Sequence, residues 1–191
     1  MYKKYNITLI LFLLLEKVPI LYWTSKTLPQ NHNIIYLSKK WFYLFTQITK
    51  NELLLNNNFL IENSALDTSN YKTLPLKLKN LYFNKLLVFY TFYYYNIKTK
   101  LTVFIGNNVS KEISYTSIDR IYNNANWLER ETSEMYNILF FWKIDTRRLL
   151  LDYSKNENPL LKNFPCDGYN DMFYNIFENQ VVLKSSEVVE L

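Results

Sequence analysis

The stretch Ala125–Asn137, read Ala-Asn-Trp-Leu-Glu-Arg-Glu-Thr-Ser-Glu-Met-Tyr-Asn, says most about the fold of this 191-residue chain. Three acids and one arginine interrupt a repeating apolar face, and this pattern is typical of a short helix that carries charge. We expect the helix to run from Glu129 to Ile138. Asn126 is the expected N-cap, because an Asn side chain can accept a hydrogen bond from a backbone N–H of the first turn.

One face of this helix is expected to pack against the rest of the protein. Its members recur at spacings of four, four and three, and they are Trp127, Glu131, Met135 and Ile138. Because this face turns one carboxylate inward, Glu131 is the candidate for a paired and partly buried charge. Glu129 and Glu131 are both expected in the first turn, where the helix dipole favours negative charge.

Charged residues also follow the helix. The apolar run Ile138–Trp142 is expected to enter an extended segment, and Arg147 and Arg148 come shortly after it. We expect at least one of these arginines to pair with a carboxylate, and the candidates are Glu129, Glu131, Glu134 and Asp152. The alternative is a set of solvated surface pairs, which contribute little to stability. Neither interpretation makes these charges catalytic.

Taken together, these positions resemble the signature of the 30 kDa-type subunit of respiratory complex I, which is called subunit 9 in mitochondria and has a counterpart in bacteria. The matching elements are Glu129-Arg130-Glu131, Glu134, Met135-Tyr136, Lys143, Arg147, Leu149-Leu150, Asp152-Tyr153 and Lys162-Asn163-Phe164-Pro165. Lys143 and Ile144 stand where the family has His and Pro. Asn137 stands where the family usually has Gly, so we expect it to adopt the left-handed conformation and to end the helix.

The resemblance implies a non-redox structural and assembly subunit in the peripheral arm of NADH:ubiquinone oxidoreductase. It implies a place beside the 49 kDa-type subunit of the quinone site, on the matrix side of the mitochondrial inner membrane. Flavin and iron–sulfur clusters are expected on neighbouring subunits, and no catalytic or cofactor-binding residue is expected on this chain. The residues assigned to structure and assembly are Glu129, Arg130, Glu131, Glu134, Asn137, Arg147, Arg148, Asp152, Tyr153, Pro159, Phe164, Pro165, Gly168 and Tyr169.

Composition agrees with these expectations. Cys166 is the only cysteine and His32 the only histidine, so the chain cannot assemble an intrachain disulfide, a four-cysteine cluster or a cysteine-and-histidine zinc site. We expect Cys166 to be a plain packed thiol. Abundant Asn, Lys, Tyr and Ile beside only 2 Gly indicate an AT-rich genome, such as that of an organelle. With no Arg- and Ser-rich presequence after Met1, we expect a protein made inside the mitochondrion.

The rest of the chain predicts an α+β fold, in which helices cover a small sheet with a central β-hairpin. Leu81–Tyr95 and Lys98–Ile105 are rich in β-branched and aromatic residues and are expected to be the two hairpin strands, joined by a turn at Asn96. Asn-rich loops are expected near residues 30–33 and 56–58. The polar composition of Glu62–Thr73 suggests an insertion.

Two further helices are expected before the hairpin. The first runs from Tyr5 to about Val18, and its apolar run Ile7–Leu15 is too short to span a membrane. The second covers Lys39–Lys50, with Ser38 as N-cap. Its buried stripe is expected to consist of Trp41, Leu44, Phe45 and Ile48.

We expect residues 1–148 to form one globular domain, since 191 residues of which 49% are hydrophobic can build a core. Residues 149–191 are expected to be an extended, irregular, partner-binding arm. The stretch 152–169 mixes Asn, Pro and single aromatics without helical or strand periodicity, so it needs a partner surface for order. Its expected anchors are Tyr153, Pro159, Phe164 and Pro165.

Two other classes of function compete with the complex I subunit. An organellar nucleic-acid-binding protein, such as a ribosomal protein, is suggested by the net charge of +5. Against it, the basic residues are interleaved with acids and form no stripe. A hydrolase could use Glu129 and Glu131, or Glu131 and Glu134, as paired carboxylates. Glu129 and Glu131 point about 200° apart around a helix, and no nucleophile or phosphate-loop motif accompanies either pair.

Overall fold

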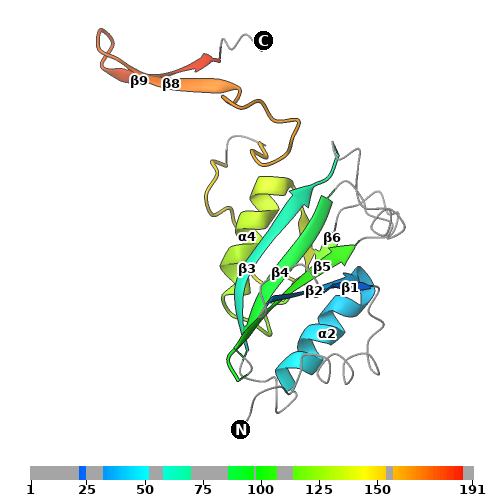
Figure 1. Ribbon diagram of the computed structural model, residues 1–191. Coiled ribbons are helices and arrows are strands. Elements are labelled where there is room, and N and C mark those ends of the chain that lie inside the picture. The colour runs from blue at the N-terminus through cyan, green and yellow to red at the C-terminus, as the bar shows by residue number, and fades with distance from the viewer. Residues whose placement is uncertain are drawn as a thin grey trace.

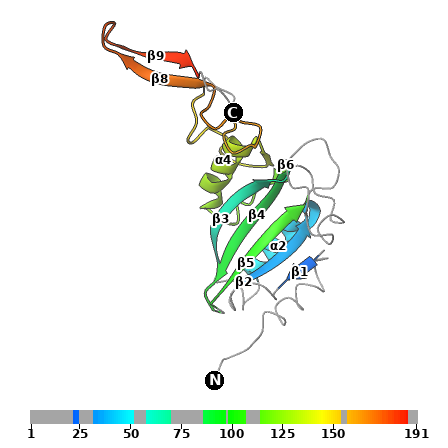
Figure 2. The same ribbon diagram turned by 45° about the horizontal axis from the view of Figure 1, so that its top comes forward.

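The computed structural model describes residues 22–24, 32–51, 58–69, 86–96, 98–106, 114–153 and 157–186. Its main sheet has five strands in the order β1-β2-β5-β4-β3. The strands are β1 (Tyr22–Thr24), β2 (His32–Ser38), β3 (Asn58–Asp67), β4 (Leu86–Tyr94) and β5 (Thr99–Gly106). The helices α2 (Lys39–Asn51) and α4 (Ala125–Tyr136) lie on the same side of this sheet (Figure 2).

The hairpin β4–β5 lies at the centre of the sheet, as the sequence predicted. Its strands pair antiparallel from Val88↔Ile105 to Tyr94↔Thr99. Lys98, with φ 53°, donates its backbone N–H to the Tyr95 carbonyl over 3.2 Å and so closes the turn. On either side, β2 runs parallel to β5 and β3 runs antiparallel to β4. The expected fold class, helices over a sheet built on a central hairpin, is therefore confirmed.

The core lies between the sheet and α2. Phe42 of α2 packs against Tyr90 of β4 with ring centroids 4.6 Å apart, and Phe45 is fully buried. Of the expected stripe of α2, Trp41 is 39% exposed and Leu44 38% exposed, so these two assignments were wrong. The buried stripe runs instead through Phe42, Phe45, Thr46 and Thr49, because the helix turns its second aromatic ring toward Tyr90.

A second, two-stranded parallel sheet flanks α4. It consists of β6 (Ser114–Thr116) and β7 (Leu139–Phe141), and α4 is the crossover between them. The strand β7 is the extended segment that the apolar run after the helix predicted. Tyr115 and Phe140 bury their rings between this small sheet and the main core.

The boundaries of α4 differ from the expected Glu129–Ile138 at both ends, because the helix runs from Ala125 to Tyr136. The helix begins at Ala125, so Asn126 lies inside it and Glu129 lies beyond its first turn. Asn124 precedes the helix and donates its side-chain N–H to the Leu60 carbonyl over 2.6 Å, which ties the helix start to β3. Asn137 ends the helix with φ 55° and ψ 49°, so the left-handed conformation predicted there is confirmed.

The arm is irregular only as far as Tyr169. Beyond it, β8 (Asn170–Asn175) and β9 (Gln180–Ser185) form an antiparallel hairpin that projects from the body (Figure 1). The expectation of an irregular arm was wrong for these residues. Apolar side chains lie opposite each other on the two paired strands, and Asn179, with φ 49°, lies in the turn that joins the strands. Cys166 is exposed, which corrects the expected packed thiol.

Some expectations fall on other parts of the chain. The helix expected at residues 5–18 and the loop at 30–31 lie outside the described residues, as do residues 70–73. Residues 62–67 belong to β3, where Asn63, Ala65 and Asp67 are buried, so this part is not an insertion. No helix within the described ranges is long and apolar enough to cross a membrane.

Candidate functional site: the Glu-Arg-Glu helix and the segment it holds

The Glu129 carboxylate lies at the junction of three parts of the fold. It is fully buried and accepts hydrogen bonds from Tyr90 Oη of β4 over 3.1 Å and from Lys143 Nζ over 3.2 Å. Residues just after β6 supply two more donors, Ser117 Oγ at 2.5 Å and the Ile118 backbone N–H at 3.0 Å. One carboxylate therefore joins the main sheet, the loop after β6 and the loop after β7.

Burial sets the electrostatics of this cluster. It raises the pKa of Glu129 above its ordinary value, although the donors at Ser117, Ile118 and Lys143 pull in the opposite direction. Burial, together with the nearby Glu129 charge, raises the pKa of Tyr90 well above its ordinary value. The Lys143 side chain is only 3% exposed and also donates to the Asn126 carbonyl over 3.0 Å. Glu129 and Lys143 thus form a buried ion pair, in which each charge depends on the other.

The buried acid of the helix is Glu129, and the assignment of that role to Glu131 was wrong. Glu131 is exposed, and Trp127 of the same expected face is 61% exposed. The buried face of α4 consists of Ala125, Glu129 and Thr132, at spacings of four and three. Thr132 fixes this rotation, because its hydroxyl donates to the Asn63 carbonyl of β3 over 3.2 Å.

Arg130 holds the chain that follows β7. Its guanidinium donates to two backbone carbonyls, Arg147 O at 2.7 Å and Arg148 O at 3.0 Å, and contacts Asp145 Oδ2 at 3.3 Å. It also lies over the Trp127 ring, 5.6 Å from the centroid. The planar fork of donors allows one arginine to fix three points of a loop.

Arg147 pairs with Asp145, a carboxylate that was not among the four candidates. Their closest N–O distance is 2.8 Å, and the hydrogen bonds from Arg147 hold the pKa of Asp145 well below its usual range. The two residues lie two positions apart in one turn, so the pair forms locally without help from α4. Arg148 donates instead to the Asp152 carbonyl over 2.5 Å, and its backbone N–H reaches Tyr153 Oη over 3.1 Å.

Glu134 is the second carboxylate of α4 that holds this loop. It accepts the backbone N–H groups of three successive residues, Leu149, Leu150 and Leu151, the last two at 2.9 Å each. Its slight burial alone would raise its pKa, but these N–H groups and the charge of Arg148 outweigh burial and lower it. The three N–H groups form a small concave anion site, and Glu134 fills it from within the protein.

The last turn of α4 also binds the chain near Asn158 and Leu160. Asn158 Nδ2 donates to the Glu134 carbonyl over 2.6 Å, and the Leu160 N–H donates to the Met135 carbonyl over 3.2 Å. These donors satisfy carbonyls that the end of a helix leaves open. Lys162 N–H reaches Asp67 Oδ2 of β3 over 3.1 Å, and Leu161 packs against the core. We call the described residues 143–153 and 157–162 the strap.

The strap therefore continues past the expected boundary between residues 148 and 149. After it, the Phe164 and Tyr169 rings pack edge to face with centroids 5.1 Å apart. Gly168, with φ 76°, closes this turn by donating its N–H to the Pro165 carbonyl over 3.1 Å. Pro159, Phe164 and Pro165 are partly buried, whereas Tyr153 is 69% exposed. Four expected anchors thus lie in or next to the strap.

Sequence reasoning missed several members of this site. Tyr90 and Ser117 contact Glu129 across 39 and 12 residues, and no pattern in the chain marks them. Lys143 was visible as a position of the resemblance, but its partner was not. Among the described residues, no group of three His, Cys, Asp or Glu side chains could hold a metal ion.

The fold and the site define a class of protein: a small α+β protein whose charged helix holds the strap that follows it. A sequence profile described as "Respiratory-chain NADH dehydrogenase, 30 Kd subunit" matches residues 35–170. The chain therefore belongs to the 30 kDa subunit family of respiratory-chain NADH dehydrogenase. The expected family is confirmed.

Individual relatives agree. NADH-ubiquinone oxidoreductase subunit 9 of Paramecium primaurelia is 32% identical, with 98% of this chain and 88% of the relative covered. A bacterial relative, an NADH-quinone oxidoreductase subunit from Parvibaculum lavamentivorans, is 38% identical over 95 residues, 50% of this chain and 46% of the relative. These relatives give no support to the nucleic-acid alternative.

Solved structures share the fold. A trypsin-resistant fragment of Nqo5 superposes with a TM-score of 0.56 at 17% identity, covering 72% of this chain and 96% of the fragment. A chain of an archaeal membrane-bound sulfane sulfur reductase, a respiratory membrane complex, gives a TM-score of 0.59 at 20% identity, covering 83% and 85%. At these identities the likeness shows the fold alone.

Proposed function

We propose that this chain is a structural and assembly subunit of the peripheral arm of NADH:ubiquinone oxidoreductase, with its arm as the part that binds neighbouring subunits. Membership of the 30 kDa family supports the complex. The Paramecium relatives named subunit 9 support a mitochondrial location. A place on the matrix side of the inner membrane is part of the same proposal. The amino-acid composition, which is rich in residues with AT-rich codons, supports a gene in the organelle.

The observation that carries the role of the arm is the hairpin β8–β9. Its exposed apolar side chains include Met172, Phe173, Ile176, Phe177 and Leu183, and Phe177 is 98% exposed. An isolated two-stranded hairpin is marginal in water, and both of its edges have unpaired backbone groups. Exposed apolar surface of this kind marks a protein interaction site. A larger neighbouring subunit, such as the 49 kDa-type subunit, is the partner we propose.

The strap fixes the point at which the arm leaves the body of the protein. Its contacts with Glu129, Arg130 and Glu134 of α4, and with Asp67 of β3, hold the chain against the body up to Lys162. The hairpin therefore leaves from a fixed point, which lowers the entropy lost on binding. The charges of α4 act on the position of the arm and carry out no chemistry in this proposal.

Assembly tests the proposal directly. A chain truncated after Tyr169 keeps every contact of the strap and loses only the hairpin and the residues beyond it. We expect this chain to fold and to be absent from the native-gel band that carries NADH dehydrogenase activity. Incorporation equal to that of the full chain would show that the hairpin is not the binding element.

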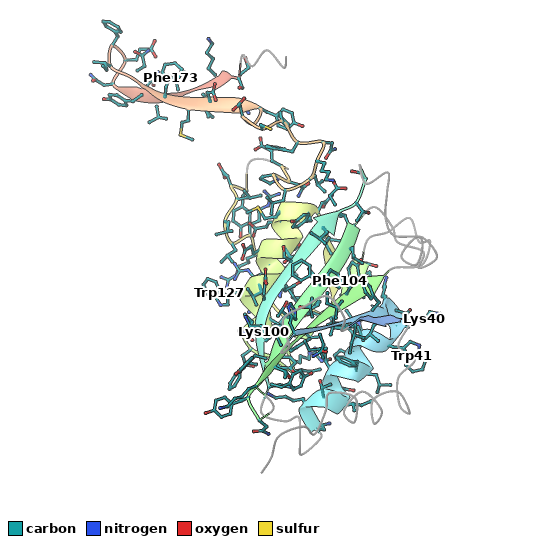
Figure 3. All side chains as sticks on the ribbon, viewed as in Figure 1. Lys40, Trp41, Lys100, Phe104, Trp127 and Phe173 are labelled. Atoms are coloured by element: carbon teal, nitrogen blue, oxygen red, sulfur yellow. The ribbon has the colours of Figure 1, made fainter. Side chains whose placement is uncertain are left out.

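Point variants sharpen the same test. Phe173→Asp places a charge on the hairpin, and Trp41→Asp places one at a partly exposed aromatic of α2, away from the arm (Figure 3). We expect incorporation to fall roughly tenfold or more for Phe173→Asp, because about 1.4 kcal/mol at an interface is already tenfold. Trp41→Asp serves as the matched control and is expected to assemble normally.

We further propose that flavin and iron–sulfur clusters of the complex are held by neighbouring subunits. One cysteine and one histidine cannot supply the ligands of a four-cysteine cluster. The purified chain should show neither a stoichiometric iron or zinc signal in elemental analysis nor flavin absorbance. Either signal, retained after dialysis against a chelator, would contradict this part of the proposal.

A further inference from the structure

The hairpin β8–β9 carries apolar or aromatic side chains on both of its faces. Each strand contains an uninterrupted run of such residues, and the two runs are Met172-Phe173-Tyr174 and Val181-Val182-Leu183. Because successive side chains of a strand point to opposite faces, each run contributes to both sides of the hairpin. The pairing register sets Met172 opposite Leu183 on one face and Phe173 opposite Val182 on the other.

Uninterrupted runs of this kind are typical of strands that are buried on both faces. A hairpin that lies flat on a partner alternates instead between apolar residues on the bound face and polar residues on the free face. In this hairpin both faces are open, since Met172 is 69% exposed on one face and Phe173 46% exposed on the other. Neither face is covered by another part of the chain that the structure describes.

Polarity changes along the length of the hairpin instead of between its faces. At the base, where the arm joins the hairpin, Asp171 lies opposite Lys184. The turn at the other end carries Ile176 and Phe177, which are 76% and 98% exposed (Figure 1). The hairpin is therefore charged at its base and apolar along its middle and at its turn.

The polar side chains of the turn find partners within the hairpin itself. Asn175 Oδ1 accepts the Phe177 backbone N–H over 3.1 Å, and Gln180 Nε2 donates to Glu178 Oε2 over 2.8 Å. Because these groups are already hydrogen-bonded, their burial in another protein costs less. Glu178 is the only charged residue of the turn.

We propose that the hairpin inserts turn first into a cleft of a neighbouring subunit, with an apolar wall against each face and a cation at the inner end. This inference rests on the arm being the part that binds neighbouring subunits, and it adds the shape and chemistry of the partner. Packed layers of sheet lie about 10 Å apart, which sets the distance from the hairpin to each wall. The cation, an Arg or a Lys, pairs with Glu178, since a carboxylate enters an apolar site only with such a partner.

The hairpin favours a protein cleft over lipid. A two-stranded hairpin has two open edges whose backbone N–H and C=O groups need hydrogen bonds, and the hydrocarbon of a membrane offers none. Its charged residues are two acids and one lysine, so an anionic lipid surface does not attract it. A protein can supply both the hydrogen bonds and the cation.

Photocrosslinking in the assembled complex tests the two walls. p-Benzoylphenylalanine replaces Phe173, Tyr174 or Phe177, one position at a time, and each change keeps an aromatic ring. Phe173 and Tyr174 are neighbours in β8 and point to opposite faces, so we expect them to crosslink to two separate segments of neighbouring subunits. Phe177 should crosslink to a third segment. Mass spectrometry of the crosslinked peptides identifies all three.

The pattern of crosslinks distinguishes this inference from the proposed function. Crosslinks from only one of Phe173 and Tyr174 would overturn the cleft and leave the binding role of the arm intact. Crosslinks only to lipid, or to a second copy of the chain, would also overturn it. If none of the three positions crosslinks, the cleft is overturned, and assembly of the truncated chain then decides whether the arm binds at all.

A pair of acid-to-amide variants tests the cation. Glu178→Gln removes the charge of the turn and keeps an oxygen for the hydrogen bond from Gln180, whereas Asp171→Asn removes a charge at the base. We expect incorporation of Glu178→Gln into the native-gel band to fall roughly tenfold, because the cation of the cleft loses its buried counter-charge. Asp171→Asn, at the rim of the cleft, is the matched control and should assemble like the wild type. Equal incorporation of the two variants would overturn the cation, and a loss for Asp171→Asn alone would overturn the direction of insertion.

Discussion

At the scale of single residues, Asn137 shows how one backbone conformation ends a helix. Its φ of 55° belongs to a region that costs a residue with a Cβ about 1–2 kcal/mol, and Asn tolerates it through its short polar side chain. Three other residues with a Cβ have positive φ in the described chain, and one of them, Trp142 at 63°, follows β7 directly. Asn137 and Trp142 thus lie in the loops next to the strap, whereas Lys98 and Asn179 lie in the turns of the two hairpins.

Replacing Asn137 by Val should lower the free energy of unfolding by about 1–2 kcal/mol, because a β-branched residue resists the left-handed region. Asn137→Gly, which keeps the conformation accessible, should stay within about 0.5 kcal/mol of the wild type. Urea unfolding of the three chains measures both differences. An equal loss for Val and Gly would mean that the side chain of Asn137, and not its backbone, stabilises the helix end.

The buried Glu129–Lys143 pair gives a second prediction at this scale. Lys143→Met removes the cation that stabilises ionised Glu129, so the pKa of Glu129 in the folded chain, already raised by burial, should rise further. An acid whose folded pKa is raised destabilises the fold as pH rises above its ordinary value, which is 4.5 for this group. At neutral pH the loss should reach about 3–5 kcal/mol, and it should shrink as the pH falls from neutral toward 4.5.

Thermal and urea unfolding of Lys143→Met between acidic and neutral pH measures this dependence. Lys40 of α2 is exposed, so Lys40→Met is the control for removing one positive charge, with an expected change within about 0.5 kcal/mol at every pH. A loss for Lys143→Met that does not vary with pH would show that lost packing, rather than the stranded carboxylate, is the cause.

At the scale of elements, α4 and the strap behave as one unit. Glu129, Arg130 and Glu134 lie along the helix and hold successive parts of the strap. Most of these bonds end on backbone groups of the strap, so they fix its path and leave its side chains free to vary. The charged positions of the helix are thereby explained by the chain that follows them.

Glu134→Gln tests this unit. The substitution replaces one of the two carboxylate oxygens by an NH2 group, which cannot accept a hydrogen bond from a backbone N–H. We expect the amides of Leu149, Leu150 and Leu151 to exchange roughly tenfold faster, since charge-assisted bonds contribute about 1.5–3 kcal/mol. The exposed Glu131→Gln on the same helix is the matched control and should leave their exchange unchanged. Equal protection in both variants would remove Glu134 from the unit.

At the scale of the whole molecule, stability is distributed unevenly between the body and the arm. The body buries a continuous core across the sheet, α2 and α4, whereas nearly every residue of β8 and β9 is exposed. Cooperative units with few buried contacts open first. The hairpin is thus the part of the described chain that a partner can order most.

Limited proteolysis should reveal this difference. In the isolated chain we expect early cleavage in β8, β9 or the turn between them, while the body to Lys162 survives. In the assembled complex the same sites should be protected, because the partner surface orders the hairpin. First cleavage within the strap, before the hairpin is cut, would show that the strap is not fixed as its hydrogen bonds indicate.

The sequence by itself determined the features that depend on local order along the chain. The β4–β5 hairpin follows from two β-rich runs around a turn, the end of α4 from an Asn that tolerates positive φ, and the family from the charged positions after Ala125. Each of these requires only neighbouring residues or a fixed spacing. The hairpin β8–β9 was missed because its strands have no buried face, so they lack the alternation of polar and apolar residues that marks a strand.

Only the tertiary structure decided which charge is buried and what it meets. The helical period allows either Glu129 or Glu131 to face inward, and the choice depends on contacts of α4 with β3, 64 and 69 residues apart along the chain. Tyr90 Oη and Lys143 Nζ then reach Glu129 from 39 and 14 residues away. A buried carboxylate is stable only where the fold places hydrogen-bond donors and a cation next to it. These partners come from distant parts of the chain, so no spacing in the sequence predicts them.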